Sequence, residues 1–545
     1  SGIFQLADGD DIEGRWTSSG NYTSDQQLEI VIHPEGALRF AEGSDWHHVR
    51  SGSAAVPIGR MTVHGDVEFY NASSLFISIG GIDVKSGGTI AVGTSLWSSG
   101  SGAKFNPGTI TLDPGATLLH VTTSQVYFDT TVVILSSDAT YKTSSSTTIF
   151  PPNFTEQGTV RYQRTTSDQT VTDRDYRSVE FSFGAEAARK LWNLGASRVI
   201  GGSLTTNNDV QAVITAGTPQ TLRVDSLLRL TSGILDVADP EISLLLSDGA
   251  LVRRATGSLI GTPTCLGVVD VEYTSTMDSV VTGAELSADS VRHLSILGNK
   301  GVRLGGNVTV GGTLLVADTG LSTGMYAVTL GASAQLDETA GWPVAGVVQT
   351  TRSVSSGVME EFGNVGLTVT PGAGTSGSVT VVRTSGSVVG GSGVSSVARS
   401  FAVSGGSPAG WTGGLVLSYS ERELGSLSEA SLQAFWSADG VSWSARGGVV
   451  DVTANTVTVS GPVAVGGRWT VGVASGCCVK RGDMNNDGKV IVSDLTYLVN
   501  FLFKGGPAPA CAAHGDLNND GKTIVSDLTF LVNFLFKGGP APAAC

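Results

Sequence analysis

The sequence is short of charge and of long apolar runs. Only 15% of its 545 residues are charged, and it contains no run of about 18 apolar residues that would predict a membrane-spanning helix. The patterns HExxH, the Walker phosphate loop and CxxC are also absent. The sequence therefore offers no catalytic residues, and we expect a protein that is not an enzyme.

What the chain has in abundance is glycine, with 73 residues, together with many serine, threonine and valine residues. This mixture favours short strands joined by tight turns, because β-branched side chains pack well on pleated sheets and glycine supplies turn geometry. The formal charge of −15 argues against nucleic acid and against an anionic membrane surface as partners. We expect a secreted or cell-surface protein, with Ser1 as a processed N-terminus.

A small unit of two turn residues followed by a strand recurs through the first 350 or so residues. It appears at residues 34–40, 86–92, 231–237 and 310–316, and alternation after the glycine turns successive side chains inward and outward. A longer repeat places Val160-Arg161-Tyr162 against Val271-Glu272-Tyr273. Such repetition predicts a mainly β protein, built either as a β-solenoid or as stacked β-sandwiches.

We divide the chain into four regions. They are an N-terminal β-rich domain (1–150, solenoid or sandwich), tandem β repeats (151–350), a β-sandwich (351–475) and a small helical module (476–545). Residues 186–194 interrupt the β pattern and are expected to form a short helix that ends at Gly195. The four tryptophans of residues 351–475 are expected in the sandwich core rather than on a sugar-binding surface. This body resembles the β-rich repetitive regions of bacterial secreted surface proteins.

The motif that carries chemistry lies in the last seventy residues. Two twelve-residue segments begin at Asp483 and Asp516, 33 residues apart, and each has oxygen-bearing side chains at positions 1, 3, 5 and 12 with glycine at position 6. Calcium needs six to eight oxygen ligands, and position 7 contributes a backbone carbonyl. The predicted ligand positions, for two calcium ions, are Asp483, Asn485, Asp487, Lys489, Asp494, Asp516, Asn518, Asp520, Lys522 and Asp527.

The distribution of acidic residues supports this interpretation. Residues 479–545 contain six acidic residues and no glutamate, and every one falls on a ligand position. The duplicated pattern resembles type I dockerin repeats, with aspartate at position 12 and a helix after each loop. Position 9 is Ile491 and Ile524, where the family has a polar residue that helps to hold a water. The resemblance implies a cohesin-like β-sandwich as the partner.

Each loop is followed by an apolar stripe at helical spacing. Leu495, Leu498, Val499 and Leu502, repeated at Leu528, Leu531, Val532 and Leu535, predict two helices that pack together. A second, aromatic stripe either packs on the chain's own β domain or faces another molecule. In dockerins the residues beside position 12 help to choose the partner, which implies a pseudo-symmetric surface. The predicted docking residues are Val492, Ser493, Tyr497, Phe501, Val525, Ser526, Phe530 and Phe534.

Covalent features complete the predictions. Cys477, Cys478, Cys511 and Cys545 bracket the two repeats and predict two disulfides in an oxidising compartment, with the connectivity left open. Glycosylation sequons occur at Asn21, Asn71, Asn153 and Asn307.

Two functions follow from these features. The first is a non-catalytic structural subunit of a fibre, cell surface or matrix, whose calcium-loaded module binds copies of the chain or a cohesin-like domain. The alternative is a polysaccharide-active enzyme or carbohydrate-binding adhesin that is attached through its dockerin, with polysaccharide as a further partner.

Overall fold

A computed structural model describes most of the chain. Up to residue 146 it describes the segments 3–6, 11–12, 29–32, 37–40, 60–69, 76–77, 81–92, 104–105, 109–120 and 132–146. From residue 148 on, the gaps are 149, 152, 183–187, 287–290, 318–319, 340, 390–393, 475–479, 486, 510–511, 521 and 544–545. The chain forms two compact units, one of Ser1–Val310 with Ala317–Thr319, the other of Gly311–Val316 with Gly320–Cys545.

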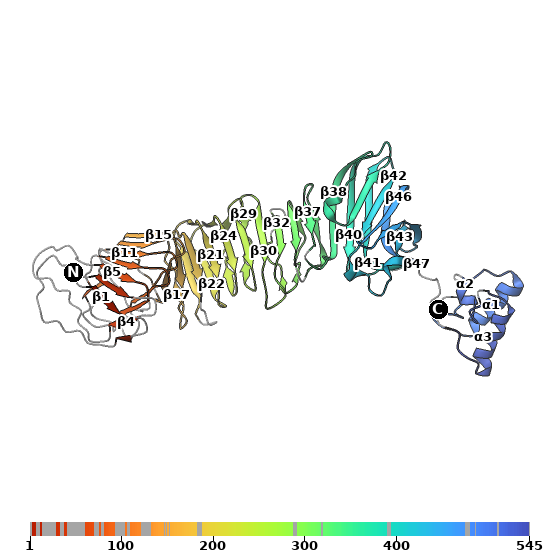
Figure 1. The fold of residues 1–545 in the computed structure, drawn as a ribbon, viewed down its shortest axis with the longest axis horizontal. Helices are drawn as coiled ribbons and strands as arrows, with labels where there is room; N and C mark the ends of the chain where they lie inside the picture. Colours follow the sequence, from red (N-terminus) through yellow and green to blue (C-terminus); the bar gives the residue numbers. More distant parts are fainter. Residues whose placement is uncertain are drawn as a thin grey trace, which may run out of the picture. The chain divides into compact units, whose positions relative to one another are not determined.

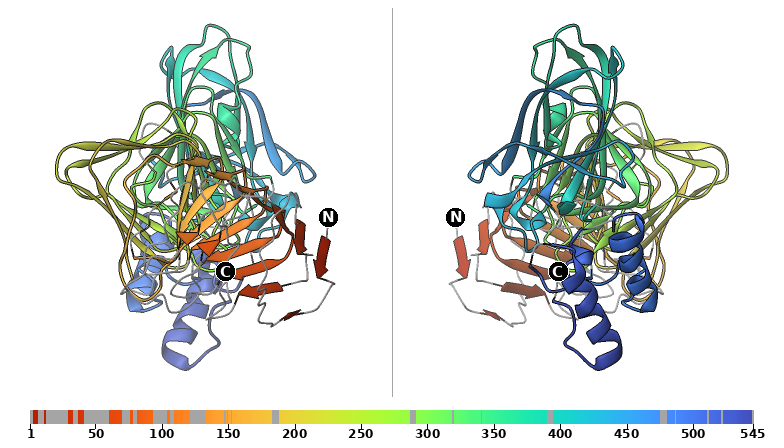
Figure 2. Two further views of the ribbon diagram at one scale, coloured as in Figure 1. Left: turned by 90° about the vertical axis from the view of Figure 1, so that its left-hand side faces the viewer. Right: turned by 90° about the vertical axis from the view of Figure 1, so that its right-hand side faces the viewer.

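Unit 1 is a β-solenoid, in which successive coils stack through parallel strand pairs (Figures 1 and 2). Its longest sheet consists of β2 (Asp11–Ile12), β4 (Ala37–Phe40), β6 (Asp66–Phe69), β9 (Thr89–Val92), β12 (Thr117–His120), β14 (Thr140–Thr143), β16 (Thr159–Tyr162), β18 (Ser178–Phe181), β21 (Ser203–Thr206), β24 (Leu227–Leu230), β27 (Leu251–Arg254), β30 (Val269–Tyr273) and β32 (Val291–Ile296). A second sheet consists of β1 (Ile3–Leu6), β3 (Glu29–Ile32), β5 (Arg60–Val63), β8 (Gly81–Val84), β11 (Thr109–Leu112), β13 (Val132–Leu135) and β15 (Asn153–Glu156).

From β18 to β29 each coil has three strands, and two further parallel sheets take the place of the second one. The first of these consists of β17 (Gln169–Thr170), β19 (Lys190–Leu194), β22 (Gln211–Ala216), β25 (Ile234–Asp236) and β28 (Ser258–Ile260). The other consists of β20 (Arg198–Ile200), β23 (Gln220–Val224), β26 (Ile242–Leu246) and β29 (Thr264–Cys265). The remaining strands of unit 1 are β7 (Phe76–Ile77), β10 (Lys104–Phe105), β31 (Val280–Val281), β33 (Val302–Arg303) and β34 (Val308–Val310).

In-register stacking gives the solenoid its core. Val160, Val179, Leu204, Leu228, Val252 and Val271 are consecutive pairing partners along the longest sheet, and each has 0% exposure. The long repeat in the sequence, from Val160 to Val271, therefore spans five coils. The prediction of a mainly β fold is confirmed, and of its two alternatives the solenoid is the one that unit 1 adopts.

Glycine allows the sharp turns that begin many strands of the coils. Gly233 precedes β25 with a φ of +80°, and a Cβ there would lie 2.2 Å from the carbonyl oxygen of Val210 in the previous coil. Only glycine tolerates both the left-handed backbone and this close approach. The predicted unit of two turn residues and a strand is confirmed at this position.

The predicted helix over residues 186–194 is wrong for its second half. Residues 190–194 form β19, which pairs in parallel with β22, and residues 183–187 lie outside the described part of the chain. Trp192 and Leu194 alternate inward with 1% exposure each. Packing against the buried side chains of the neighbouring coil, which is distant in sequence, therefore outweighs the helical propensity of residues 190–194.

Unit 2 begins with parallel strands and changes to antiparallel pairing at β38. The strands β35 (Thr313–Val316), β36 (Leu321–Leu330) and β37 (Gln335–Asp337) precede β38 (Ala345–Ser355), which pairs in parallel with β36 and antiparallel with β40 (Ser376–Ser385). That sheet continues through β41 (Val394–Ser407), β47 (Gly467–Ala474), β43 (Gln433–Ser437) and β44 (Ser444–Gly447). A second antiparallel sheet contains β39 (Leu367–Pro371), β42 (Thr412–Ser418), β46 (Thr456–Ala464) and β45 (Val449–Asp451).

Tryptophans lie inside this antiparallel part of unit 2, as predicted. Trp411, Trp443 and Trp469 are buried and Trp436 is half-buried. The indole nitrogens of Trp411, Trp436 and Trp469 each donate to a backbone carbonyl at 2.8–2.9 Å. Each of these rings therefore fills apolar space without leaving its polar N–H group unpaired.

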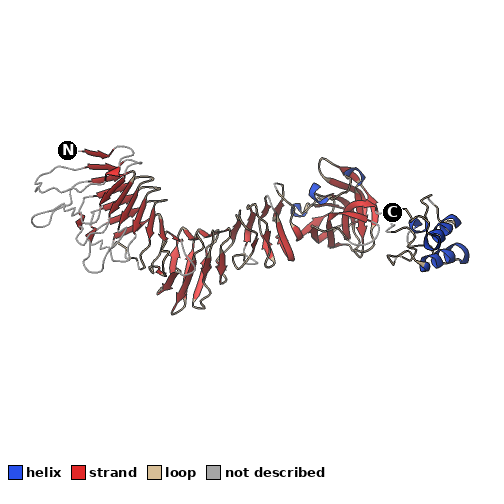
Figure 3. Cartoon of the chain, turned by 90° about the horizontal axis from the view of Figure 1, so that it is seen from below, coloured by secondary structure: helices blue, strands red, loops and turns tan. Residues whose placement is uncertain are grey.

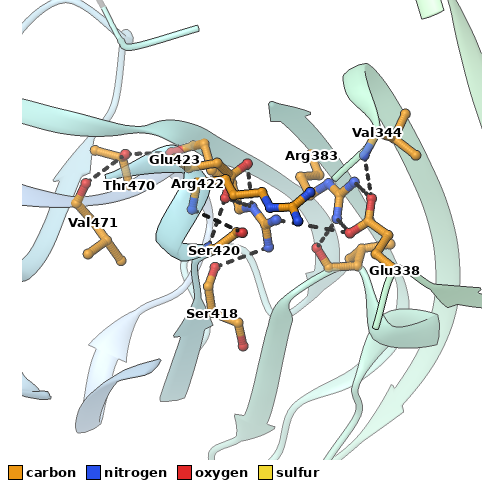
Figure 4. A network of polar contacts seen from close by, with 11 residues as sticks. Glu338, Val344, Arg383, Ser418, Ser420, Arg422, Glu423, Thr470 and Val471 are labelled. Atoms are coloured by element: carbon orange, nitrogen blue, oxygen red, sulfur yellow. Dashed lines mark hydrogen bonds and ion pairs between the residues drawn. The ribbon is translucent and has the colours of Figure 1, made fainter. Parts of the chain in front are cut away.

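An ion-pair network lies between these strands (Figure 4). Arg383, with 0% exposure, donates to both carboxylate oxygens of Glu338 (2.6 and 2.8 Å), and Glu338 also accepts from the N–H of Val344 (2.6 Å). Arg399 pairs with Glu423 at 2.9 Å and lies 4.0 Å from Glu338. Burial alone would raise the pKa of Glu338, but Arg383 and Arg399 hold that pKa below its usual value.

Helices follow the β-rich part of unit 2. They are α1 (Val492–Lys504), α2 (Ala512–Gly515) and α3 (Val525–Lys537), preceded along the chain by the short 3-10 helices η1 (Phe362–Asn364), η2 (Glu421–Glu423) and η3 (Glu429–Ser431) (Figure 3). No helix of the described residues is long and apolar enough to cross a membrane.

Candidate metal centre

The first predicted loop brings three carboxylates together. Asp483, Asp487 and Asp494 each place one carboxylate oxygen so that all three atoms lie within 4.8 Å of one another. Asp483 is 1% exposed and Asp494 is 0% exposed, whereas Asp487 is exposed. Converging carboxylates of which two are buried repel one another unless a cation lies between them. An all-oxygen donor set of this kind fits a hard divalent cation such as calcium.

Backbone hydrogen bonds hold the carboxylates of the first loop in place. Asp483 accepts from the N–H groups of Asp487 (3.0 Å) and Gly488 (2.7 Å), across the tight turn of the loop. Gly488 has a φ of +86°, so position 6 of this loop favours glycine. The side-chain oxygen of Asn485, at position 3, accepts from the N–H of Asp487 at 3.1 Å.

Asp494 at position 12 connects the loop to the helix. One of its oxygens accepts from the N–H groups of Met484 (2.8 Å) and Asn485 (3.3 Å). The other accepts from the N–H of Ile491 (2.9 Å), immediately before α1. A single carboxylate therefore satisfies backbone donors at both ends of the loop and supplies negative charge at a helix N-terminus.

The second loop repeats these contacts. Asp527 accepts from Leu517 (2.8 Å), Asn518 (3.3 Å) and Ile524 (2.9 Å), and Asp516 accepts from Asp520 (2.9 Å). Position 6 of this loop, residue 521, lies outside the described residues. The side chains of Lys489 and Lys522, at position 7, are exposed, as expected where only the backbone carbonyl would bind the ion.

Arg481 makes the two loops unequal. Its guanidinium lies 3.3 Å from the carboxylate of Asp516 and donates to the Asn519 side chain and to the Asp516 carbonyl, both at 2.5 Å. The residue 33 positions later is His514, so the first loop has no arginine in the equivalent position. In the described residues, the grouping of three carboxylates within 4.8 Å occurs in the first loop alone. Arg481 thus partly neutralises a predicted ligand of the second loop.

Replacing Arg481 with glutamine is expected to tighten calcium binding at the second loop by about tenfold. The change removes a positive charge beside the ion and releases the Asp516 carboxylate for coordination, a gain of about 1.4 kcal/mol. Calorimetric titration of the full chain, analysed for two sites, measures the effect. Lys537→Gln removes the same charge from the exposed end of α3 and serves as the control. Unchanged or weaker binding in Arg481→Gln contradicts the explanation.

The two helices bury their facing apolar stripes. Leu498 and Leu531 have 0% exposure and form a core with Met484 and Leu517, and α1 packs against α3. Both helices end at a glycine in the left-handed conformation, Gly505 and Gly538. The predicted packing of the helices is confirmed.

The predicted docking residues separate into two groups. Val492, Ser493, Val525 and Ser526 are exposed at the helix N-termini. Tyr497, Phe501, Phe530 and Phe534 are half-buried and pack against the module's own core. Phe503 and Phe536, the last members of the predicted aromatic stripe in each repeat, are each 59% exposed. The exposed apolar positions thus occur in pairs, one in each repeat.

The predicted covalent sites are only partly described. Cys477, Cys478, Cys511 and Cys545, and the sequons at Asn21 and Asn71, lie outside the described residues. Asn153 in β15 and Asn307 are exposed.

Comparison with known proteins identifies the module. Residues 481–536 match the family model described as the dockerin type I domain. No curated protein and no solved structure matches the chain. The match confirms the resemblance drawn from the loop spacing, and it covers the two loops, α1 and all of α3 except its last residue.

Proposed function

We propose that this chain is a secreted structural and interaction protein whose dockerin module, ordered by calcium, attaches the β-solenoid-bearing body to a cohesin-type domain. The observation that carries the proposal is the cluster of Asp483, Asp487 and Asp494 inside a segment that matches a dockerin domain. Dockerin domains bind calcium and dock on cohesins, and proteins that bear them are typically extracellular. Calcium, when bound, supplies the positive charge that the converging carboxylates require.

The chain's own residues explain how the ion would control docking. Asp494 joins the loop to the start of α1, and Asp527 does the same for α3. Ordering the loops therefore fixes the orientation of both helix N-termini. Those termini carry the exposed pairs Val492-Ser493 and Val525-Ser526, which we assign to the partner surface.

A non-catalytic role for the body is supported by its outward-facing charges. Along the longest solenoid sheet, carboxylates are paired with arginines on adjacent coils, as in Arg161–Glu180 (2.8 Å), Arg253–Glu272 (2.6 Å) and Arg292–Asp270 (2.6 Å). Such cross-coil pairs satisfy the charges along the stack. General acid–base catalysis requires a carboxylate with a perturbed pKa that faces a cleft. Burial raises the pKa of Glu156 in β15 to about 7, and this carboxylate too is paired with an arginine, Arg174, at 3.4 Å.

Binding of the full chain to a panel of recombinant type I cohesin domains tests the proposal. In calcium we expect a complex with at least one of them, and a chelator should dissociate it. The double variant Val492→Asp/Val525→Asp should lose binding, because a charge would be buried at either docking pair. Each single variant should retain binding through the other repeat. A complex that persists in chelator, or in the double variant, contradicts the proposed surface.

Electron microscopy of the full chain alone, with calcium and with chelator, separates docking to a partner from self-assembly. Single particles in both conditions support docking to a cohesin domain on a separate molecule. Polymers that dissolve in chelator would instead make a second copy of the chain the partner.

A further inference from the structure

The longest sheet of unit 1 carries charges in a repeated order on its outer face. From β14 to β32 the next-to-last residues of the strands are consecutive pairing partners, and we call this row the charge column. Its first four members are Lys142, Arg161, Glu180 and Thr205. Its next four are Arg229, Arg253, Glu272 and Ser295. Each group of four thus reads as two cations, a carboxylate and a hydroxyl.

The charge column faces away from the solenoid core. Tyr141 and Thr143, on either side of Lys142, have 0% exposure, and so have Leu228 and Leu230 on either side of Arg229. Lys142 and Arg229 themselves are half-buried. Because side chains alternate between the two faces of a strand, the column lies on the outer face of the sheet.

Only one cation of each group is neutralised. Arg161 pairs with Glu180 at 2.8 Å, and Arg253 pairs with Glu272 at 2.6 Å. Lys142 and Arg229, the first cations of the two groups, form no ion pair with a residue that the structure describes. The Nε atom of Arg229 is buried and also makes no hydrogen bond within that part of the chain. Each group therefore presents one uncompensated positive charge.

Like charges stand directly opposite each other in both groups. Lys142 is the pairing partner of Arg161, and Arg229 is the pairing partner of Arg253. Such pairs are unfavourable in a sheet. Burial, and then the charge of Arg161, lower the pKa of Lys142. An anion above the pair would remove this repulsion, and local conflicts of this kind are typical of functional sites.

The surface beside the charge column is suited to a ligand with many hydroxyls. Thr140, Thr159 and Ser178 lie in register two residues before the first three members and on the same face. Their hydroxyls are half-buried, and each is able to donate and to accept a hydrogen bond. Beside the second group, Leu227 and Leu251 are pairing partners and present apolar surface.

The two uncompensated cations are spaced for a long and sparsely charged ligand. The strands of this sheet follow one another along unit 1 (Figure 1). Lys142 and Arg229 are four strand steps apart, which is about 19 Å at about 4.8 Å per step. A small anion reaches one of them, whereas a polymer along the stack reaches both. Nucleic acid, with one charge per about 1.7 Å of duplex, would be repelled by the carboxylates of Glu180 and Glu272.

We propose that the charge column from β14 to β27 binds a carboxylate-bearing polysaccharide that lies along the stacked strands. Lys142 and Arg229 pair with carboxylates of the polymer, and the hydroxyls of Thr140 and Thr159 bond to its sugar hydroxyls. Charge-assisted pairs of this kind give both affinity and register. The surface belongs to unit 1 and is independent of the calcium loops, so it goes beyond the docking function.

Titration of the full chain with polygalacturonate and with alginate, followed by calorimetry, tests the proposal. A chelator is present throughout, because calcium would bridge these polymers to the acidic chain. At least one of the two should bind at low ionic strength, and the binding should weaken with added salt, since exposed charges are screened. Fully methyl-esterified polygalacturonate has the same backbone without the charges and should bind about tenfold more weakly or not at all.

Lys142→Gln and Arg229→Gln should each weaken binding of the acidic polymer by about tenfold, the loss of one charged contact, and the double variant should abolish it. Arg303→Gln is the matched control. Arg303 is exposed in β33, outside the charge column, and the variant removes the same charge from unit 1. Its affinity should equal that of the unmodified chain. Each variant of the column relieves a like-charge pair, so neither should lower the melting temperature of unit 1.

Three results would overturn the polysaccharide surface. The first is the failure of both acidic polymers to bind the full chain at low ionic strength. The second is equal affinity in the Lys142→Gln/Arg229→Gln double variant and in Arg303→Gln. The third is a single-stranded oligonucleotide that binds the column more tightly than either polymer. Cohesin binding by the double variant in calcium should remain intact, which separates this surface from the docking module.

Discussion

Replacing Asp494 with alanine is expected to abolish calcium binding at the first loop and to release α1 from its ordered state. Asp494 has 0% exposure and accepts from the N–H groups of Met484, Asn485 and Ile491. The variant leaves these backbone donors without their acceptor, and each unsatisfied buried group costs about 1–3 kcal/mol. It also removes one of the three carboxylates that converge in the loop.

The loss should exceed what so small a module can tolerate. Its core consists of Met484, Leu498, Leu517 and Leu531, so bound calcium contributes a large part of its stability. At a free calcium concentration 100 times the dissociation constant, one ion stabilises the folded state by about 2.7 kcal/mol. Hydrogen–deuterium exchange in peptides from α1 and α3 should therefore rise sharply in Asp494→Ala, and likewise in the unmodified chain with chelator.

Lys489→Ala is the matched control for this experiment. It lies in the same loop at position 7, its side chain is exposed, and only its backbone carbonyl would bind the ion. Its calcium stoichiometry and exchange rates should equal those of the unmodified chain. The interpretation of the loop fails if Asp494→Ala binds as much calcium as this control and protects α1 equally well.

Replacing Glu338 with glutamine is expected to destabilise unit 2 by about 3–5 kcal/mol, the cost of breaking a buried ion pair. The variant keeps the shape of the side chain but removes the charge that faces Arg383 (0% exposed) and Arg399 (6% exposed). Glu423, which pairs with Arg399, would then be the only carboxylate left in the network, and Arg383 would lose its partner. At about 2–4 °C per kcal/mol, the melting temperature of unit 2 should fall by roughly 6–20 °C.

Glu421→Gln provides the comparison for Glu338→Gln, because Glu421 is exposed in η2 and undergoes the same chemical change. Its melting temperature should stay within about 2 °C of that of the unmodified chain. The way in which the stability of unit 2 depends on pH follows from the lowered pKa of Glu338. Its stabilising contribution is complete above the unfolded-state pKa and is lost as the pH falls through the lower folded-state pKa. Equal melting temperatures for the two variants would show that the buried pair does not stabilise the fold.

Local spacing explains why the metal centre was predictable from the sequence. Every predicted ligand of one loop lies within twelve consecutive residues, and the two loops are 33 residues apart with the same helix after each. The unequal environment of the loops was not predictable in this way. It depends on Arg481 reaching Asp516, 35 positions later, across the packed module.

The remaining features depend on contacts between distant residues. The alternation of apolar and polar residues and the glycine turns predicted strands. Only the pairing register between coils, however, distinguishes a solenoid from a sandwich in unit 1. Residues 190–194 form a strand because Trp192 joins a buried stack that the local sequence does not reveal. Glu338, Arg383 and Arg399 lie far apart along the chain, so the ion-pair network has no sequence motif.

The in-register columns of unit 1 also govern how this solenoid can change in length during evolution. Inserting or deleting one whole coil keeps every column aligned, so Val179 and Leu204 would simply gain or lose a neighbour of the same kind. Inserting or deleting a single residue in a strand would instead turn its inward-facing side chains toward water. Each added coil extends the stack by about 4.8 Å, the distance between neighbouring strands. The length of the solenoid can thus be adjusted in fixed steps while its core chemistry stays the same.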